Sequence, residues 1–318
     1  MVIAAFNAAR WIEAAIASVQ AQTLTSWVLA VVDDGSTDET WAAMQRAAAG
    51  DGRIVLHRQD NRGAPAARNA GYRLLPAEVE YLHFLDADDW LAPEALETLS
   101  GCLAENPQAG VVACGFFNVL ADGRVATGWR PRHVCGAVLP RTLGEAEAVT
   151  PFEAFFFGTG NGPFVMMRKA VFAATRGWSE EFWGHNDTDM LLQMALEAEV
   201  RYLPERLYFK RQIEGSLIRR PGRRALYGKL RAKWDFYPAP DARRQGLIDR
   251  ARENYYRKFR PARAGWTLLK RVRLWVSGPT RVRAAGVMEM ARLTAHDLWF
   301  YTVLRRPITS DGRGASIR

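Results

Sequence analysis

The sequence predicts an α/β fold in which a mostly parallel sheet is flanked by helices and followed by a basic, helical C-terminal region. Short apolar runs alternate with amphipathic helical patterns through the first 120 residues. This alternation is typical of a parallel sheet with helices on its faces. Two of the apolar runs end directly in a cluster of aspartates. From about residue 215 onward, Arg, Trp and Tyr recur at helical spacings between Pro and Gly breaks.

The expected elements follow these patterns in order. We expect strands at 2–5, 28–33, 54–56, 81–86, 110–117, 165–167 and 200–203. We expect helices at 12–19, 38–49 and 187–198, one with Pro65 in its first turn and one opened by Pro93. Asp38 is placed to cap the second helix, and Pro204 is expected to stop the last strand. Between about 120 and 150 the alternation is lost, and we expect loops there.

Composition limits the class of protein. With 318 residues, 48% of them hydrophobic, the chain can bury the core of one large domain or two smaller ones. Cys102, Cys114 and Cys135 are 12 and 21 positions apart, which fits neither a disulfide framework nor a zinc site, so we expect reduced, buried thiols. The sequence contains no signal-peptide pattern at its start and no apolar run of about 18 residues. We therefore expect a cytoplasmic protein without a membrane span.

The net charge of +9 is divided unevenly along the chain. Residues 1–205 carry 15 Lys+Arg and 26 Asp+Glu, a net charge of −11, whereas residues 206–318 carry 28 and 8, a net charge of +20. The acidic part would need a metal ion or local arginines to hold a phosphorylated ligand. The basic part could bind phosphates or anionic lipid directly.

The two aspartate clusters are Asp33-Asp34-Gly35-Ser36 and Asp86-Ala87-Asp88-Asp89. In an open parallel sheet, ligands bind beyond the carboxyl ends of the strands, where both clusters are expected to lie. Oxygens of the second cluster could share a divalent cation, whose charge would neutralise a diphosphate. Either cluster alone could equally cap a helix or end a strand. The presence of both favours a binding site.

Five motifs, in order, resemble those of the family 2 glycosyltransferases, which have the GT-A fold. They are Ala4-Ala5-Phe6-Asn7-Ala8-Ala9, Val31-Val32-Asp33-Asp34-Gly35-Ser36-Thr37-Asp38, Asn61-Arg62-Gly63, Ala67-Arg68-Asn69-Ala70-Gly71 and Phe84-Leu85-Asp86-Ala87-Asp88-Asp89-Trp90. The resemblance implies a GT-A domain at 1–215, with its Rossmann-like sheet, followed by a basic, aromatic-rich helical region at 216–318. It also implies an inverting transfer from a nucleoside diphosphate sugar, most simply a UDP-sugar, to a hydroxyl of a saccharide or lipid-linked saccharide. Surface polysaccharide synthesis is the implied pathway.

The same resemblance implies roles for individual residues. The implied nucleotide contacts are Ala4, Phe6, Asp34, Asn61, Arg68 and Asp86, with Asp34 accepting a hydrogen bond from the base. Asp88 is the expected principal ligand of a Mn²⁺ or Mg²⁺ ion, and Asp89 is the close alternative. Without the motif, an arginine on a helix such as Arg68 would be interpreted as a solvated surface residue.

The segment Gly184-His185-Asn186-Asp187-Thr188-Asp189 resembles the Glu-Asp-x-Asp motif that precedes a helix in the family. The resemblance places Asp187 as the catalytic base, which takes the proton of the acceptor hydroxyl. Asn186 stands where relatives usually have Glu, so the base lacks one neighbouring charge. Without the upstream motifs, Asp187 would be interpreted as a helix cap.

Other residues near the expected base and at the end of the domain have two interpretations each. Trp178 and Trp183 could stack on a sugar ring or could be ordinary core aromatics. His185 could bind a metal or phosphate, or could only pack beside the cap. Lys210-Arg211 resembles a segment that closes over the donor diphosphate, although a solvated basic turn has the same composition.

The basic region beyond residue 215 interleaves aromatic residues with arginines. Helices of this kind can lie peripherally on an anionic membrane, here the inner face, or can pack as a cap on the catalytic domain. No recognised nucleic-acid motif accompanies the charge, so nucleic acid is not an expected partner.

Three rival functions each have their own sequence requirements. A nucleotidyltransferase would need a glycine-rich phosphate loop after the first strand, which residues 4–10 do not form. A dinucleotide oxidoreductase would need a Gly-x-Gly-x-x-Gly turn, and no expected strand is followed by one. A non-catalytic protein that binds a sugar nucleotide or a polysaccharide remains an alternative, because Asn186 replaces the Glu that relatives usually have beside the base. Members of the family usually have several residues before the first strand, so truncation of the first strand is also an alternative.

Overall fold

The computed structural model describes residues 1–120, 124–125, 164–181, 186–213, 242, 244–246 and 248. The chain divides into two compact units, Met1–Arg252 and Glu253–Arg318, and every described residue belongs to the first. The loops expected at 120–150 and the helices expected beyond 215 lie almost wholly outside the described residues. The expected domain boundary at residue 215 stays a prediction.

The first half of the chain alternates strands and helices as predicted. The elements are β1 (Val2–Ala5), α1 (Ile12–Gln20), β2 (Leu29–Asp33), α2 (Thr40–Ala48), β3 (Ile54–Arg58), α3 (Ala64–Arg73) and β4 (Tyr81–Asp86). These four strands are parallel, with β1 between β2 and β4 and with β3 outside β2. Pro65 lies in the first turn of α3. The Asp38 carboxylate accepts the N–H of Thr40, the first residue of α2, at 3.0 Å.

The second half contributes antiparallel neighbours, so the sheet is mixed. Its elements are β5 (Trp90–Leu91), α4 (Ala95–Glu105), β6 (Ala109–Val119), β7 (Val165–Arg168), α6 (Lys169–Ala174), α7 (Asn186–Glu197) and β8 (Glu199–Arg211). The strand order is β3-β2-β1-β4-β7-β6-β8-β5. Strand β7 is antiparallel to β4 and β6, β5 is antiparallel to β8, and β6 is parallel to β8. Neither β5 nor α6 was predicted, because each is too short to produce a periodic pattern.

The prediction that Pro204 stops the last strand is wrong. Strand β8 continues to Arg211 because Leu203 pairs with Cys114 and Arg206 pairs with Gly115, which leaves Pro204 and Glu205 in a bulge. A residue in a bulge need not donate to the ladder, so the missing N–H of proline is tolerated there. The continued strand brings its C-terminal residues to the acidic cluster described below.

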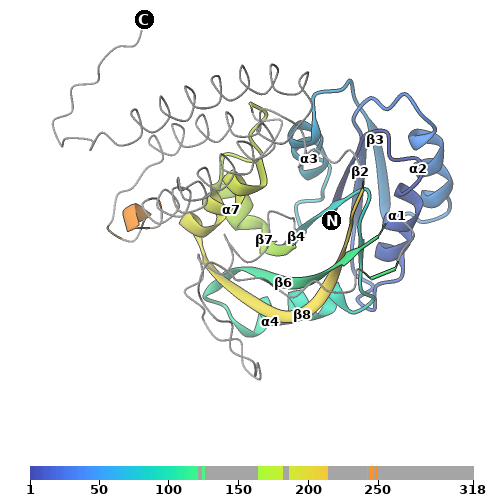
Figure 1. The fold of residues 1–318 in the computed structure, drawn as a ribbon. Coiled ribbons are helices and arrows are strands. Elements are labelled where there is room, and N and C mark those ends of the chain that lie inside the picture. Colours follow the sequence, from blue (N-terminus) through green and yellow to red (C-terminus); the bar gives the residue numbers. More distant parts are fainter. Residues whose placement is uncertain are drawn as a thin grey trace, which may run out of the picture. The chain divides into compact units, whose positions relative to one another are not determined.

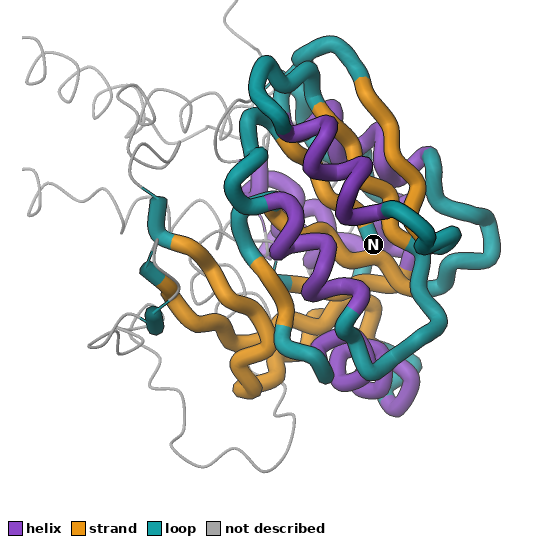
Figure 2. The backbone as a smooth tube through the Cα atoms, turned by 90° about the vertical axis from the view of Figure 1, so that its right-hand side faces the viewer, coloured by secondary structure: helices purple, strands orange, loops and turns teal. Residues whose placement is uncertain are grey.

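Helices cover both faces of the sheet (Figure 1). Ile3 and Val31 belong to the large core cluster that contains Ile16 of α1. The neighbouring Val32 packs with Ala67 of α3 on the opposite face. Figure 2 views the molecule from the side of α1 and α2, which lie in front of the strands. Because both faces are buried here, β1 and the first four residues of β2 are apolar.

Helix α3 lies very close to β1 and β2. A Cβ atom added at Gly71 would lie 2.4 Å from Cγ1 of Val2 and 3.3 Å from Cγ2 of Val32. Only a residue without a side chain fits this spacing, so Gly71 allows the close approach. The approach also carries the preceding residues of α3, including Arg68, to the carboxyl ends of the strands.

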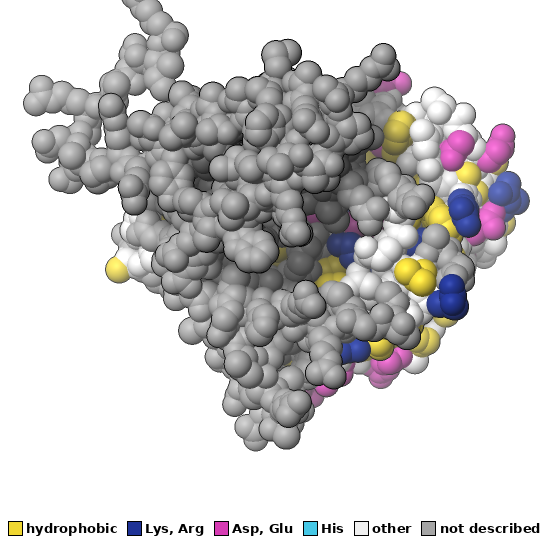
Figure 3. All heavy atoms as spheres, in the orientation of Figure 1, with side chains coloured by type: hydrophobic (Ala, Val, Ile, Leu, Met, Phe, Trp, Pro, Cys, Tyr) yellow, Lys and Arg dark blue, Asp and Glu magenta, His cyan; other side chains and the backbone are white. Residues whose placement is uncertain are grey.

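The outer side of α1 and α2 is an ordinary solvated surface. Glu13 of α1 and Arg46 of α2 form an exposed ion pair at 2.8 Å. Figure 3 shows acidic and basic side chains interspersed on this part of the molecule. Cys102 and Cys114 are free and buried, as predicted, while Cys135 lies outside the described residues. None of the helices in the described parts of the chain has both the length and the hydropathy that a membrane span requires.

Candidate active site

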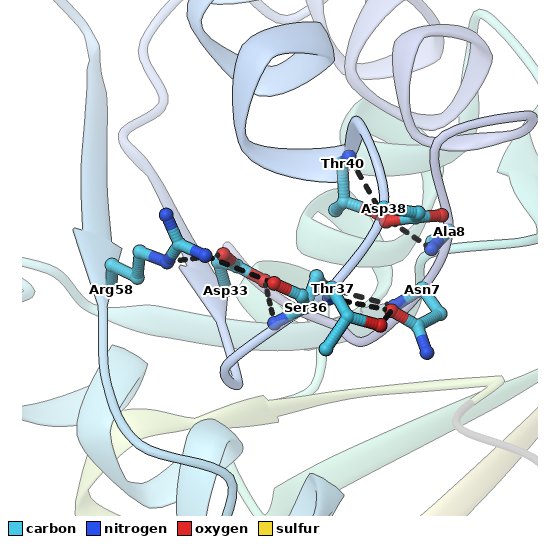
Figure 4. A network of polar contacts seen from close by, with 8 residues as sticks. All are labelled: Asn7, Ala8, Asp33, Ser36, Thr37, Asp38, Thr40 and Arg58. Atoms are coloured by element: carbon cyan, nitrogen blue, oxygen red, sulfur yellow. Dashed lines mark hydrogen bonds and ion pairs between the residues drawn. The ribbon is translucent and has the colours of Figure 1, made fainter.

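A network of polar contacts joins the turns that follow β1 and β2 (Figure 4). Asn7 has a left-handed backbone conformation, with φ of 48°. Its N–H donates to Oγ of Ser36 at 2.9 Å, and its Oδ1 accepts the N–H of Thr37 at 2.9 Å. Asp33 accepts the N–H of Ser36 at 3.0 Å and pairs with Arg58 at 3.0 Å. The two turns therefore hold a fixed relative position.

Asp34 organises the turn that follows β3. Its side chain is buried, and its carboxylate accepts hydrogen bonds from Nε2 of Gln59 at 2.7 Å, the N–H of Arg62 at 3.0 Å and the N–H of Gly63 at 2.7 Å. Gly35, with φ of 72°, brings the two turns together, since a Cβ there would lie 2.8 Å from the backbone N of Asn61. Asp34 thus supports the shape of the 59–63 turn from within.

The other predicted nucleotide contacts border this turn. Phe6 follows β1 and is 50% exposed. Asn61 is exposed in the turn itself. Ala4 pairs with Val32 on one side and with Asp86 on the other. Strand β1 therefore lies between the turn after β2, which contains Asp34, and the second aspartate cluster at the end of β4.

The second cluster lies at the end of β4 and in the turn toward β5. Asp86, Asp88 and Asp89 each offer one carboxylate oxygen, and these three oxygens lie within 4.8 Å of one another. Both oxygens of Asp89 accept hydrogen bonds from the end of β8: the hydroxyl of Tyr208 donates at 2.8 Å, and the N–H of Arg211 donates at 2.7 Å. The continuation of β8 beyond Pro204 therefore completes this cluster.

The cluster carries more negative charge than its surroundings stabilise. Burial, together with the neighbouring Asp86, raises the pKa of Asp88 to about 6. Burial, Asp88 and Asp86 raise the pKa of Asp89 well above its ordinary value. Carboxylates this close resist simultaneous ionisation unless a positive charge joins them. Three hard oxygen donors and a deficit of positive charge fit a divalent cation such as Mg²⁺ or Mn²⁺.

Arg68 connects this cluster to Asp187. One guanidinium nitrogen of Arg68 donates to Oδ1 of Asp86 at 2.6 Å, and the other lies 3.4 Å from Oδ1 of Asp187 in the first turn of α7. The Arg68 guanidinium lies 4.3 Å from the centroid of the Trp178 ring. The N–H of Asp187 donates to Oδ1 of Asn186 at 2.8 Å. The predicted metal ligands and the predicted base therefore share one site.

Comparison with known proteins assigns the family. The model of the family described as "Glycosyl transferase family 2" matches residues 1–173, more than half of the chain. The chain belongs to glycosyltransferase family 2. The sequence-based assignment to this family is thus confirmed, and the protein is an enzyme that uses a nucleotide-sugar donor.

This glycosyltransferase has relatives of very different length. It is 28% identical over 242 residues to the uncharacterized glycosyltransferase EpsJ of Bacillus subtilis, covering 74% of this chain and 69% of that protein. It is 35% identical over 112 residues to chondroitin synthase of Escherichia coli, covering 35% of this chain but only 16% of that much longer protein.

Solved structures confirm the GT-A fold of the glycosyltransferase. S. aureus TarS 1–349 in complex with UDP-GlcNAc has a TM-score of 0.63 at 15% identity, with coverage of 90% of this chain and 78% of that one. The mannosyltransferase PcManGT of Pyrobaculum calidifontis, in complex with GDP-Man and Mn²⁺, has a TM-score of 0.63 at 18% identity, with coverage of 95% and 82%. At these identities the likeness concerns the fold.

Trp178 packs against α3 of the glycosyltransferase. Its side chain is 4% exposed, Arg68 covers one face of the ring, and Phe84 meets the ring edge-on at 5.1 Å. This position fits the interpretation of Trp178 as a packed core aromatic. The other two residues predicted around the base, Trp183 and His185, lie outside the described residues.

Lys210 and Arg211 end β8 beside the acidic cluster. The Arg211 guanidinium lies over the rings of Trp11 at 4.2 Å and Trp90 at 4.6 Å, and its Nε donates to the backbone oxygen of Asp88 at 3.0 Å. Nζ of Lys210 lies 5.4 Å from the centroid of the Phe164 ring. Arg211 is therefore anchored at the cluster by stacking and hydrogen bonding.

Two contributors to the site were missed by the sequence analysis for structural reasons. Tyr208 lies beyond Pro204, where the strand was expected to end, and belongs to none of the quoted motifs. Gln59 follows a strand that is two residues longer than predicted. After Pro204, Leu207, Tyr208 and Phe209 form a short apolar and aromatic run, but the sequence alone does not show that this run continues the strand that begins before Pro204.

Proposed function

We propose that this glycosyltransferase is a metal-dependent, inverting enzyme. It transfers a sugar from a nucleoside diphosphate sugar, most simply a UDP-sugar, to a hydroxyl of a saccharide or lipid-linked saccharide in surface polysaccharide synthesis. The observation that carries the proposal is the link from Asp86 through Arg68 to Asp187, since it unites a cation-binding cluster and a base. The UDP-GlcNAc bound to TarS and the GDP-Man and Mn²⁺ bound to PcManGT support the choice of donor and cation.

On the donor side, the Asp34 turn with Ala4, Phe6 and Asn61 would hold the nucleotide. Asp86, Asp88 and Asp89 would hold Mn²⁺ or Mg²⁺, which when bound would neutralise the departing diphosphate. Asp88 is the better candidate for the principal ligand because both oxygens of Asp89 already accept protein hydrogen bonds. Lys210, at the end of β8, would add positive charge near the diphosphate.

On the acceptor side, Asp187 would act as the base. The acceptor oxygen attacks the anomeric carbon, the bond from that carbon to the diphosphate breaks, and the acceptor proton passes to the Asp187 carboxylate. Attack from the face opposite the leaving diphosphate inverts the anomeric configuration. Asn186, which accepts the N–H of Asp187, supports the start of α7 without adding charge.

Donor turnover in the presence of Mn²⁺ tests the assignment of the base. Asp187→Asn keeps the size of the side chain but cannot take up the proton, so we expect kcat to fall by about 10²- to 10⁴-fold. The exposed Glu105→Gln, at the end of α4, is the matched control and should leave kcat unchanged. Turnover is measured by release of nucleoside diphosphate from a panel of donor sugars, with and without a chelator.

Two results would contradict the proposal. Equal turnover by wild type and Asp187→Asn would remove Asp187 as the base. Donor binding without metal-dependent turnover in either protein would instead indicate a non-catalytic sugar-nucleotide binder.

The proposal includes peripheral attachment to an anionic membrane surface through the basic part of the chain. Residues 206–318 carry a net charge of +20, which favours anionic headgroups, and a lipid-linked acceptor would be presented there. Salt-sensitive binding to anionic vesicles, absent with zwitterionic ones, is the direct measurement. Packing of this part on the catalytic domain is the alternative that a negative result would favour.

A further inference from the structure

Arg68 occupies a position that binding of a nucleotide does not by itself require. Its side chain is 8% exposed, and the two terminal nitrogens of its guanidinium face carboxylates from different elements, Asp86 of β4 and Asp187 of α7. These two carboxylates are 31% and 25% exposed. The arginine is thus the most deeply buried member of the three and lies between the other two.

The protein holds this guanidinium from several directions. The Trp178 ring lies against it at 4.3 Å. The backbone of Trp178 is held in turn by Asn69, whose Oδ1 accepts the N–H of Trp178 at 2.9 Å and whose Nδ2 donates to its carbonyl at 2.9 Å. Consecutive residues of α3 therefore carry the charge and fix the ring that supports it.

Burial of the Arg68 charge restricts where its partner carboxylates can lie. A guanidinium removed from water is costly unless carboxylates neutralise it with good geometry. Its planar fork has a rigid arrangement of donors, so two carboxylates bound to one fork have a fixed separation. A base must also be ionised and held near the acceptor hydroxyl before it can take a proton.

We propose that Arg68 is a positioning residue for the Asp187 carboxylate, which it holds at a fixed distance from the acidic cluster. Its contribution to sugar transfer then runs through the base rather than through the nucleotide. This inference rests on the proposed function, because it assigns to Asp187 the role of the base.

The position of Arg68 predicts opposite effects on catalysis and on cation binding. Its positive charge lies 2.6 Å from Asp86 and competes with a divalent cation for the same carboxylates. Removal of Arg68 should therefore leave Mn²⁺ affinity unchanged or increase it, while kcat falls. A residue that binds the donor phosphates would instead raise the donor KM when removed.

The experiment compares Arg68→Ala and Arg68→Lys with wild type and with Arg73→Ala, an exposed arginine at the end of the same helix. Donor kcat and KM are measured, and Mn²⁺ affinity is measured without donor by electron paramagnetic resonance. For Arg68→Ala we expect kcat to fall by about 10²-fold, the size of the loss from a misplaced group, with donor KM within about threefold. Added guanidinium ion should restore part of kcat because it can occupy the vacated space over Trp178.

Arg68→Lys keeps the charge, but a single ammonium has no planar fork with which to meet both carboxylates. Its kcat should fall between those of wild type and Arg68→Ala, and it serves as the folded test variant if Arg68→Ala does not fold. Thermal unfolding of each variant identifies such a loss of structure. Arg73→Ala should match wild type in every measurement.

The inference is overturned if the variant loses donor affinity while kcat is maintained, or if Mn²⁺ affinity and kcat fall together. Its failure is distinguishable from failure of the proposed function. If Asp187→Asn is inactive but the Arg68 variants keep wild-type kcat, only the role of Arg68 is wrong. If Asp187→Asn is fully active, the assignment of the base itself is wrong.

Discussion

At the scale of single residues, Tyr208 shows how the acidic cluster depends on a side chain from a distant strand. Tyr208 is fully buried, its hydroxyl donates to Oδ2 of Asp89, and its ring meets Phe164 edge-on at 4.5 Å. Burial and the neighbouring Asp89 raise its pKa well above the ordinary value, so the hydroxyl keeps its proton and acts as a donor. This hydrogen bond orients the Asp89 carboxylate.

Tyr208→Phe tests this orienting role. Loss of the hydroxyl leaves one oxygen of the buried Asp89 without its donor, and loss of such a supporting contact typically weakens metal binding by about 10- to 100-fold. We expect a decrease of this size in Mn²⁺ affinity, measured by isothermal titration calorimetry. Tyr81→Phe, at the opposite end of β4, is the matched control. Unchanged affinity in Tyr208→Phe would show that the hydroxyl of Tyr208 does not support the cation site.

The expected direction of the change in Mn²⁺ affinity distinguishes the loss of Tyr208 from the loss of Arg68. Tyr208 supplies a neutral donor that positions a ligand, so its loss weakens cation binding. Arg68 supplies a full positive charge next to Asp86, so its loss favours the cation. The two residues approach the same cluster from different elements, and only their electrostatic character predicts the sign of each change.

At the scale of elements, the contact of α3 with β1 and β2 determines where Arg68 lies. Gly71→Ala would place a methyl group 2.4 Å from Cγ1 of Val2, inside a packed interface of α3 and the sheet. Such overpacking typically costs about 1–3 kcal/mol. We expect a decrease of this size in the free energy of unfolding, measured by urea denaturation, together with reduced activity as α3 shifts.

Gly101→Ala in α4 is the matched control for this prediction. Both glycines lie inside helices, but a Cβ at Gly101 meets no atom within 4 Å. Alanine has the higher helix propensity, so this variant should gain up to about 1 kcal/mol of stability. If both variants changed stability equally, helix propensity and not the close approach of α3 would explain the Gly71 result.

The same elements show what the sequence predicted and what it could not. Strands β1, β2 and β4 were predictable because each contains a mostly apolar run that is largely buried, and the aspartates that end β2 and β4 were predictable with them. Strand β3 was predictable from its apolar residues 54–56, although it is only partly buried. The path of β8 was not predictable, because the pairing that turns Pro204 into a bulge residue depends on β6, about 90 positions earlier. Tyr208 and its bond to Asp89 were missed for that reason.

The contact of Arg68 with Asp187 was also not predictable from the sequence. The motif containing Arg68 and the helix start at Asp187 were both identified, but a distance between residues 119 positions apart requires the tertiary structure. Local patterns predict elements and strand ends, whereas contacts between elements depend on packing over the whole sheet.

At the scale of the whole molecule, His83 couples the stability of the sheet to pH. His83 lies in β4, its Nδ1 is 2.7 Å from the backbone oxygen of Val165 in β7, and its Nε2 is buried without a hydrogen-bond partner among the described residues. Burial lowers the pKa of His83 from 6.5 to about 4.

The unfolded chain binds a proton at His83 near pH 6.5, while the folded chain does not until about pH 4. Between these values the free energy of unfolding should therefore fall as pH falls, by about 3 kcal/mol in total. His83→Asn retains a donor for the Val165 carbonyl and removes the titrating ring. We expect the stability difference between wild type and this variant to shift by about 2–3 kcal/mol against wild type from pH 7 to pH 4.5, measured by urea denaturation. The carboxylates common to both proteins cancel in this comparison, so a difference that is constant with pH would show that His83 is protonated equally in the folded and unfolded chains.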